Sequence, residues 1–570
     1  MKKLRYISIR TMMRYESFSG DIDYLSNQLR WLDWPYCPLQ CLPSNFHAKK
    51  LVNLNIYRSC RITRLWEGHK NFPRLTWMNL SGCESLKELP HLSEIPNLKE
   101  LNLSGCESLK ELPDLSEIPN LKELNLSGCE SLNELPDLSG IPNLKELNLS
   151  GCTSLKELPD FSGIPNLEEL DLSKCTSLVK IPDSVGLLDK LVTLNVDYCD
   201  NLIMFPRKIN LKSVETISMM FSKLKEFSEV GEEMVSLRKL NLAATRIKEL
   251  HPSITKLIGL EELILGACEN LTTLPYNIYE LHNLKILFAT GCFKLATFPE
   301  IPIKMDSLRD LHLPRSGIRE LDESIKNLIG LQRLDLRCCK NLTTLPCNIY
   351  GLQNLVDLDL SGCSKLVRFP TNTKILNVDG CSLSLPKLDY LNIAGCSLLS
   401  DCDFLMTLDC WETLEWLNLS RNNFVSLPAC LTKFVKLQML DLSGCKRLRG
   451  IPEIPPNVKP KIRGCESLEE RSSTLTDPGA VIEAASPSIE EPTPSSWLSL
   501  SSETPKRHRS AEEPSPTPVN PPKRQRTAAG GQAPVVPMFP DHHSTTSPQL
   551  QHQDESTELL RLSLLRLSLS

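Results

Sequence analysis

A repeat of 23 residues constrains the fold of this chain more than any other feature of its sequence. Leu75, Leu98, Leu121, Leu144 and Leu167 are spaced at this interval, and each opens a version of LKELNLSGCESLKELP. Looser copies of the form LxxLxLxxC begin at Leu4, Leu29, Leu51, Leu191, Val214, Leu237, Leu260, Leu284, Leu308, Leu331, Leu355, Leu388, Leu414 and Leu437. Tandem copies at one period predict a solenoid of roughly twenty repeats, because a single repeat cannot bury its leucines alone.

Each repeat contains a short stretch with the alternation typical of a β-strand. In the copy that begins at Leu98, we expect Leu101 and Leu103 to point into the core and Glu100 and Asn102 to point outward. The equivalent stretches of neighbouring repeats would then pair as short parallel strands.

The second half of each repeat must return along the opposite side. A recurring Leu-Pro step, as in Leu89-Pro90, limits regular helix there. The three-residue spacing of Ile278, Leu281 and Leu284 nevertheless predicts a helical turn. Strands of neighbouring repeats pack more closely together than the segments on the opposite side, so the stack must curve with the strands on its inner side. The predicted fold class is an α/β solenoid: a curved leucine-rich-repeat horseshoe with a parallel inner β-sheet and short helical or irregular convex segments, over residues 1–470.

The 22 cysteines follow the repeat and not a metal-binding pattern. Most occupy one slot of the repeat: Cys83, Cys106, Cys129, Cys152, Cys175, Cys199, Cys268, Cys292, Cys339, Cys363, Cys396 and Cys445. We expect an interior ladder in which each small thiol donates weakly to a carbonyl of the adjacent repeat, with Asn422 as a substitute in one repeat. Zinc-type CxxC pairs are missing, and free thiols favour a reducing compartment.

The composition is that of an ordinary soluble protein, with a net charge of -5. The sequence contains no HExxH motif, nucleophile elbow or phosphate-binding loop. We therefore expect no enzyme activity, no metal and no cofactor. Neither nucleic acid nor a membrane is an expected partner, and the predicted location is the cytoplasm and the nucleus.

Segments that flank the regular repeats carry a more specific resemblance. They are LRWLDWPYCPLQCLPSNFHAKKLVNLNI at 29–56, LWEGHKNFPRLTWMNLSGCESLKELP at 65–90 and LDLSGCKRLRGIPEIPPNVK at 440–459. This sequence resembles the repeat region of plant TIR-type nucleotide-binding leucine-rich-repeat (TIR-NBS-LRR) disease-resistance proteins over roughly residues 1–470. The resemblance implies recognition of a pathogen effector or a guarded host protein, in a receptor whose repeats restrain a nucleotide switch.

The sequence departs from that family in lacking the switch itself. It has no P-loop GxxxxGK[ST], and no TIR or nucleotide-binding segment precedes the repeats in these 570 residues. We therefore expect the chain to bind neither ADP nor ATP. A truncated receptor that acts with a nucleotide-binding receptor chain is one interpretation, and an incomplete gene model is the other.

Outward strand positions of the concave face are the candidate partner-binding site, because rigid strands hold a broad surface there. The later repeats vary most and are predicted to expose Met220, Ile264, Ile286, Phe288, His312, Arg333, Arg337, Tyr390 and Trp416. Aromatic and arginine side chains commonly anchor interfaces. The alternative is that the chain's own loops cover some of them, or that the register places them elsewhere.

The early repeats present a uniform surface. Glu100, Glu123, Glu146 and Glu169 are predicted to form an acidic column. Such a column could attract a basic partner. A solvated face copied by recent duplication explains it equally well.

Residues 471–570 are predicted to be a disordered tail rich in proline and serine. Two basic clusters in this tail resemble a bipartite nuclear-import signal: Lys506, Arg507 and Arg509, then Lys523, Arg524 and Arg526. The alternative is a pair of solvated charge clusters.

The chain ends in two alternating leucine runs. They are Leu560, Leu562 and Leu564, followed by Leu565, Leu567 and Leu569. Each is similar to the LxLxL repression motif that docks on Topless-type corepressors, while a short helix is the alternative. The sequence therefore supports two functions: a recognition module of an immune receptor, and a nuclear adaptor that recruits a corepressor through its tail.

Overall fold

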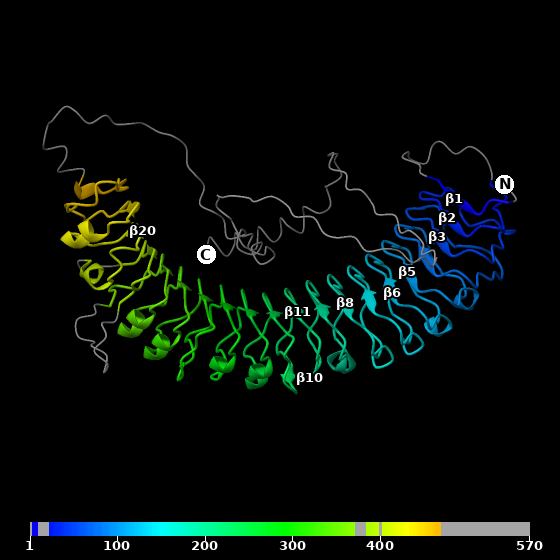
Figure 1. Cartoon of the computed structure of the whole chain (residues 1–570), viewed down its shortest axis with the longest axis horizontal. Coiled ribbons are helices and arrows are strands. Elements are labelled where there is room, and N and C mark those ends of the chain that lie inside the picture. Colours follow the sequence, from blue (N-terminus) through cyan, green and yellow to red (C-terminus); the bar gives the residue numbers. More distant parts are fainter. Residues whose placement is uncertain (1–2, 10–21, 371–383, 398–401, 469–570) are drawn as a thin grey trace, which may run out of the picture. The chain divides into compact units, whose positions relative to one another are not determined.

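The computed structural model describes residues 3–9, 22–370, 384–397 and 402–468. In this part of the chain, 19 strands form one parallel sheet in which each strand pairs with its neighbour along the chain (Figure 1). The strands are β1 (Tyr6–Ser8), β2 (Trp31–Asp33), β3 (Asn53–Asn55), β4 (Trp77–Asn79), β5 (Glu100–Asn102), β6 (Glu123–Asn125), β7 (Glu146–Asn148), β8 (Glu169–Asp171), β9 (Thr193–Asn195), β11 (Thr216–Ser218), β13 (Lys239–Asn241), β14 (Glu262–Ile264), β15 (Ile286–Phe288), β16 (Asp310–His312), β17 (Arg333–Asp335), β18 (Asp357–Asp359), β19 (Tyr390–Asn392), β20 (Trp416–Asn418) and β21 (Met439–Asp441).

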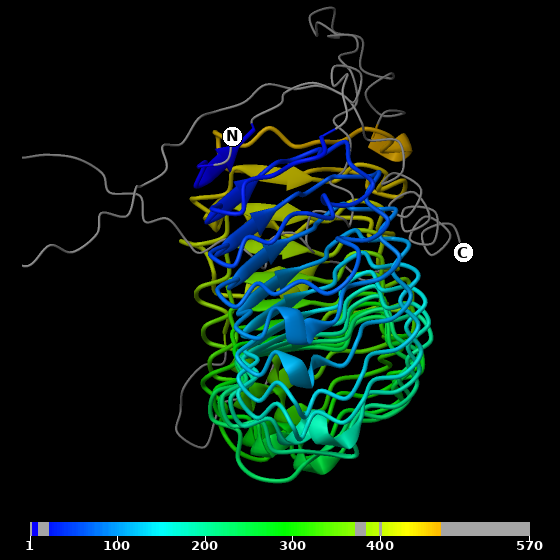
Figure 2. The ribbon, with the colours of Figure 1, turned by 90° about the vertical axis from the view of Figure 1, so that its right-hand side faces the viewer.

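The strands stack with their central residues aligned from one repeat to the next. Leu101 of β5 pairs with Leu124 of β6, which pairs with Leu147 of β7. Leu101 and Leu103 are 2% and 0% exposed, so both point into the core as the alternation predicts. In Figure 2 the strand arrows of successive repeats follow one another in the same orientation. The predicted parallel inner sheet is confirmed.

A hydrogen-bonded turn explains why each strand is only three residues long. The side-chain oxygen of Asn102, the last residue of β5, accepts a hydrogen bond from the backbone N–H of Ser104 at 2.9 Å. That N–H is then not available to continue the sheet. Gly105 follows with φ of 68°, in the left-handed region where glycine has no steric penalty. The chain therefore turns at the same point in each such repeat, although the backbone N–H of Gly105 still donates to the carbonyl oxygen of Ser127 in the next repeat at 2.6 Å.

The thiols lie in the interior immediately after this turn. The Sγ atom of Cys106 donates to the carbonyl oxygen of Leu80 at 3.3 Å, and that of Cys129 donates to Leu103 at 3.3 Å. The amide nitrogen of Asn422 makes the equivalent bond to Ile393 at 2.8 Å. All the described cysteines are free thiols. The predicted ladder is confirmed, including its asparagine substitute.

The convex side carries short 3₁₀ helices and one small additional sheet. The helices are η2 (Leu92–Glu94), η3 (Leu115–Glu117), η4 (Asp183–Leu187), η5 (Pro252–Lys256), η6 (Ile278–Glu280), η7 (Glu323–Asn327), η8 (Cys347–Gly351), η9 (Asp403–Thr407) and η10 (Ala429–Lys433). The small sheet pairs β10 (Lys208–Ile209) with β12 (Glu229–Val230). The sheet of 19 strands lines the inner side of an arc and these elements lie on its outer side (Figure 1). The helical turn predicted at residue 278 is the single turn η6.

Replacing Cys129 by alanine tests the energetic role of the ladder. The variant loses the donor to Leu103 and leaves a small void, so we expect the free energy of unfolding to fall by about 1–2 kcal/mol. Cys129→Asn is the matched control, because Asn422 shows that an amide fills the same place, and we expect it to lose less. Urea unfolding followed by circular dichroism measures both variants. Equal losses would contradict the bonding role.

Candidate functional site

Two columns of side chains cover the concave face. The first residue and the third residue of each strand point outward, while the middle residue is buried in the core. We call these the first column and the second column. Because neighbouring strands lie about 4.8 Å apart, consecutive members of a column are close enough to interact.

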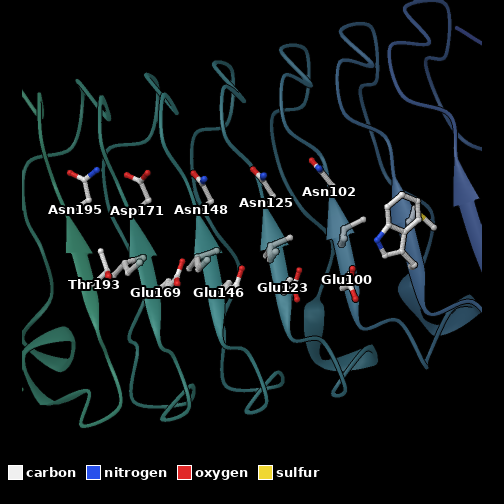
Figure 3. Close-up of a pocket in the computed structure, with 16 residues that line it drawn as sticks. Glu100, Asn102, Glu123, Asn125, Glu146, Asn148, Glu169, Asp171, Thr193 and Asn195 are labelled. Carbon is white, nitrogen blue, oxygen red and sulfur yellow. The ribbon is translucent and has the colours of Figure 1, made fainter. Parts of the chain in front are cut away.

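The uniform half of this face runs from β4 to β9. Glu100, Glu123, Glu146 and Glu169 follow one another in the first column, and Asn102, Asn125, Asn148 and Asp171 in the second (Figure 3). Together with Trp77, these residues line an open hollow of about 340 Å³.

Electrostatic repulsion within the acidic column is moderate. Partial burial, followed by the charges of neighbouring glutamates, raises the pKa of Glu123 and of Glu146 above the usual value. The side-chain oxygens of Asn102, Asn125 and Asn148 accept hydrogen bonds from their own turns. The predicted acidic column therefore exists as a geometric feature, and both explanations of it stay open.

The varied half of the face brings together most of the residues predicted as a partner-binding site. Their positions are Ile264 on β14, Ile286 and Phe288 on β15, His312 on β16, Arg333 on β17, Arg337 just after β17, Tyr390 on β19 and Trp416 on β20. Met220 is separated from this group, since it follows β11 and its sulfur accepts a hydrogen bond from Asn241 at 3.5 Å. We call the outward face of β14–β20, with Arg337, the varied surface.

Aromatic and charged side chains interlock in the centre of the varied surface. The ring of Phe288 stacks on that of His312 with 4.5 Å between centroids. The Nδ1 atom of His312 lies 3.6 Å from Asp335, and the guanidinium of Arg337 donates to both oxygens of the same carboxylate. Burial alone would raise the pKa of Asp335, but the hydrogen bonds from His312 and Arg337 outweigh it and lower that pKa.

Arg333 is also held by a carboxylate, on the strand before it. Its Nη2 atom donates to Oδ2 of Asp310 at 2.6 Å. Asp310 is only 4% exposed, and its Oδ1 atom has no hydrogen-bond partner among the described residues. Arg333 itself remains exposed. The guanidinium of Arg333 is therefore exposed to solvent, while the carboxylate of Asp310 partly neutralises its charge.

A second aromatic pair lies at the far end of the surface. The rings of Tyr390 and Trp416 stack almost parallel, with 4.4 Å between centroids and 5° between planes. The Nδ2 atom of Asn392 donates to the hydroxyl of Tyr390 at 3.2 Å and to Asp359 at 3.2 Å. These bonds hold the tyrosine ring in a defined orientation.

Sequence reasoning missed the carboxylates that organise this surface. Asp310 and Asp357 belong to the first column, and Asp335 and Asp359 to the second. These aspartates occupy the same outward strand positions as the predicted aromatic and arginine residues, so the alternation within each strand could have identified them. The prediction considered only residue types that commonly anchor interfaces, and it therefore omitted the aspartates that pair with the arginines.

Asp357 generates a stability prediction. Burial, followed by the charges of Asp359 and Asp335, raises its pKa from 3.8 to about 6. Because the folded-state pKa lies above the unfolded one, stability present below about pH 4 is lost as the pH rises through 6. We expect Asp357→Asn to increase the free energy of unfolding at neutral pH by about 1–2 kcal/mol, after allowance for partial exposure.

The native chain and Asp357→Asn should have similar free energies of unfolding near pH 4, where the carboxyl group of Asp357 is protonated. Urea midpoints at both pH values measure the difference. Asp306→Asn, at an exposed site outside the sheet, is the control. A gain that is equal at both pH values would show that the carboxylate charge is not its cause.

The predicted tail sites lie outside the described residues. These are the basic clusters at 506–509 and 523–526 and the leucines between 560 and 569. Among the described residues, no helix is long and apolar enough to span a bilayer, and no group of His, Cys, Asp or Glu side chains is arranged to hold a metal ion.

Comparison with known families identifies the repeats. Residues 281–481 match the family described as "Disease resistance protein RPS4B-like, leucine-rich repeats", and residues 119–163 match "Leucine Rich repeats (2 copies)". The first of these matches contains most of the varied surface.

Curated relatives come from plants. The chain is 28% identical to TMV resistance protein N of Nicotiana glutinosa, over 45% of this chain and 28% of that protein. It is 34% identical to disease resistance protein RPS4B of Arabidopsis thaliana, over 39% of this chain and 17% of that protein. It is also 34% identical to disease resistance protein RPS6 of Arabidopsis thaliana, over 66% of this chain and 26% of that protein. The chain therefore spans about a sixth to a quarter of the length of these relatives.

Solved structures include the leucine-rich-repeat protein LIC12759 of Leptospira interrogans, with 21% identity, a TM-score of 0.40 and coverage of 76% of this chain and 96% of that chain. YopM of Yersinia enterocolitica has 22% identity, a TM-score of 0.35 and coverage of 71% and 88%. Residues 119–163 and 281–481 are thus leucine-rich repeats, and the chain is similar over its repeat region to the leucine-rich repeats of plant disease resistance proteins.

Proposed function

We propose that this chain is a protein-recognition module of a plant intracellular immune receptor and binds its partner through the varied surface. The partner is a pathogen effector, a guarded host protein or a nucleotide-binding receptor chain that acts with it. Catalysis forms no part of the proposal, because the surface is a broad sheet face on which most of the polar side chains hold one another in place.

One observation carries this proposal: aromatic and arginine side chains gather on the outward face of β14–β20 and are held there by buried carboxylates. Arg333 and Arg337 are paired with Asp310 and Asp335, and the two ring pairs are stacked. Preorganised aromatic and arginine anchors lose little conformational entropy on binding, which is what interface hot spots require.

The contrast between the two halves of the sheet supports the same assignment. From β5 to β8 the first column contains only glutamate, whereas from β15 to β20 it contains Ile286, Asp310, Arg333, Asp357, Tyr390 and Trp416. The core residues beneath are leucines in both halves. A specific contact surface needs different side chains at its outward positions. Core packing alone would place no such demand on those positions.

Replacing Ile286, Phe288 and Arg333 together by alanine tests the proposal. All three are at least partly exposed, so we expect folding to persist and partner binding to weaken by roughly 30-fold or more. Proximity labelling in plant cells, with the full chain as the labelling fusion, identifies the neighbours that depend on this surface, and purified partners then give the dissociation constants.

A matched control changes three exposed apolar residues away from the sheet. Leu187, Tyr276 and Ile303 are 60%, 72% and 48% exposed, and their replacement by alanine should leave the labelled neighbours unchanged. Retained binding by the variant of the varied surface, with a normal circular dichroism spectrum, would refute the assignment.

A further inference from the structure

Asp357 differs from the other carboxylates of the varied surface in having no side-chain partner among the residues that the structure describes. Asp310 is paired with Arg333, Asp335 with Arg337 and His312, and Asp359 accepts hydrogen bonds from the backbone N–H of Ser361 and from Asn392. Among the described residues, Asp357 accepts no hydrogen bond and forms no ion pair, although it is only partly exposed. Its charge is therefore poorly solvated and not compensated within this part of the chain.

The nearest cations are already committed to other groups. Arg333 is the strand neighbour of Asp357 on β17, but its guanidinium reaches back to Asp310 on the opposite side. Arg337 donates three side-chain hydrogen bonds to Asp335, which fixes its fork geometry. The charges of Arg333 and His312 lower the pKa of Asp357, but burial and the charges of Asp359 and Asp335 outweigh them, and that pKa stays raised. A counter-ion for Asp357 must therefore come from outside these pairs.

An aromatic face adjoins this carboxylate. Tyr390 pairs with Asp357 on one side and with Trp416 on the other. Since Trp416 covers the ring face on its own side, the other face of the tyrosine is directed toward β18. Asp359 and Asp357 both act on the phenol, whose pKa is raised mainly by burial and then by these two charges. The ring and the unpaired carboxylate thus border the same small area of surface.

We propose that Asp357 and the ring face of Tyr390 that is directed toward β18 receive a cationic side chain, arginine or lysine, from the protein partner. The inference rests on the proposed function and specifies the chemistry that the varied surface recognises. A carboxylate supplies the counter-charge, and the negative face of an aromatic ring attracts a cation within about 6 Å of its centroid. Trp416 behind Tyr390 and Asn392 at its hydroxyl hold the ring in place for this contact.

Neighbouring groups make an anionic or neutral anchor a poorer fit at this point. Asp359 stands in the second column on the same strand as Asp357, and Asp335 stands beside it on β17. An incoming carboxylate would meet the like charges of Asp357 and Asp359, and an apolar group would bury Asp357 further without compensation. A cation would instead be attracted by these carboxylates and would compensate the charge of Asp357.

A library of random twelve-residue peptides on phage provides the probe. Panning on the full chain, with counter-selection on the Ile286, Phe288 and Arg333 triple variant, yields peptides that depend on the varied surface. Each peptide is synthesised with its arginines and with citrulline, which keeps the shape and removes the charge. Dissociation constants are measured for the native chain, for Asp357→Asn and for Glu169→Gln, which removes a carboxylate from the uniform half of the same face.

The expected result is that the selected peptides carry arginine or lysine and that citrulline weakens binding to the native chain at least tenfold. The same replacement should change binding to Asp357→Asn less than threefold, while Glu169→Gln behaves like the native chain. Peptides that need the varied surface but are insensitive to citrulline, or that lose equal affinity in both carboxylate variants, overturn the inference and leave the recognition surface standing. If no peptide depends on the varied surface, the inference and the proposed function fail together.

Discussion

The hydrogen bond between a buried thiol and the backbone carbonyl of the preceding repeat is the interaction on which the rest of the solenoid depends. It recurs from Cys83 to Cys465, with Sγ-to-oxygen distances between 3.1 and 3.5 Å. It links two repeats through a carbonyl that also accepts a backbone hydrogen bond within its own turn, as Leu103 does from the backbone N–H of Cys106 at 3.1 Å. Burial raises the pKa of Cys83 and Cys199 to about 12, so that the thiols stay protonated and act as donors.

Because the interior fixes the spacing of the repeats, the concave face can vary without affecting the core. Leucines beneath β5 and beneath β18 are equally buried, although glutamate covers one strand and aspartate the other. The varied surface then obtains its order from a second set of contacts within the columns. Arg333 with Asp310, and Arg337 with Asp335, are held by partners that are themselves nearly buried. Core packing and the contacts of the concave face thus involve different side chains of the same strand.

Sequence alone predicted the solenoid, the alternation within each strand and the thiol ladder. All three follow from the spacing of leucines and cysteines, which recurs in most of the repeats. The contacts across the columns could not be predicted in the same way. Arg333 has an aspartate on each neighbouring strand, and only the structure shows that it pairs with Asp310 and not with Asp357, which has no counter-ion in the described part of the chain. Met220 illustrates a second limit, since a residue that fits the repeat pattern lies two positions beyond β11 and apart from the other candidates.

The near identity of the repeats that begin at Leu98, Leu121 and Leu144 has a consequence for how such a chain can change over generations. Each presents the same turn, with Gly105, Gly128 and Gly151 in the left-handed region, and the same leucines to the repeat on either side. Gain or loss of one whole unit by unequal recombination would therefore create no mismatched interface. It would lengthen or shorten the uniform half by one strand spacing, about 4.8 Å, and leave the order of side chains on β14–β20 untouched.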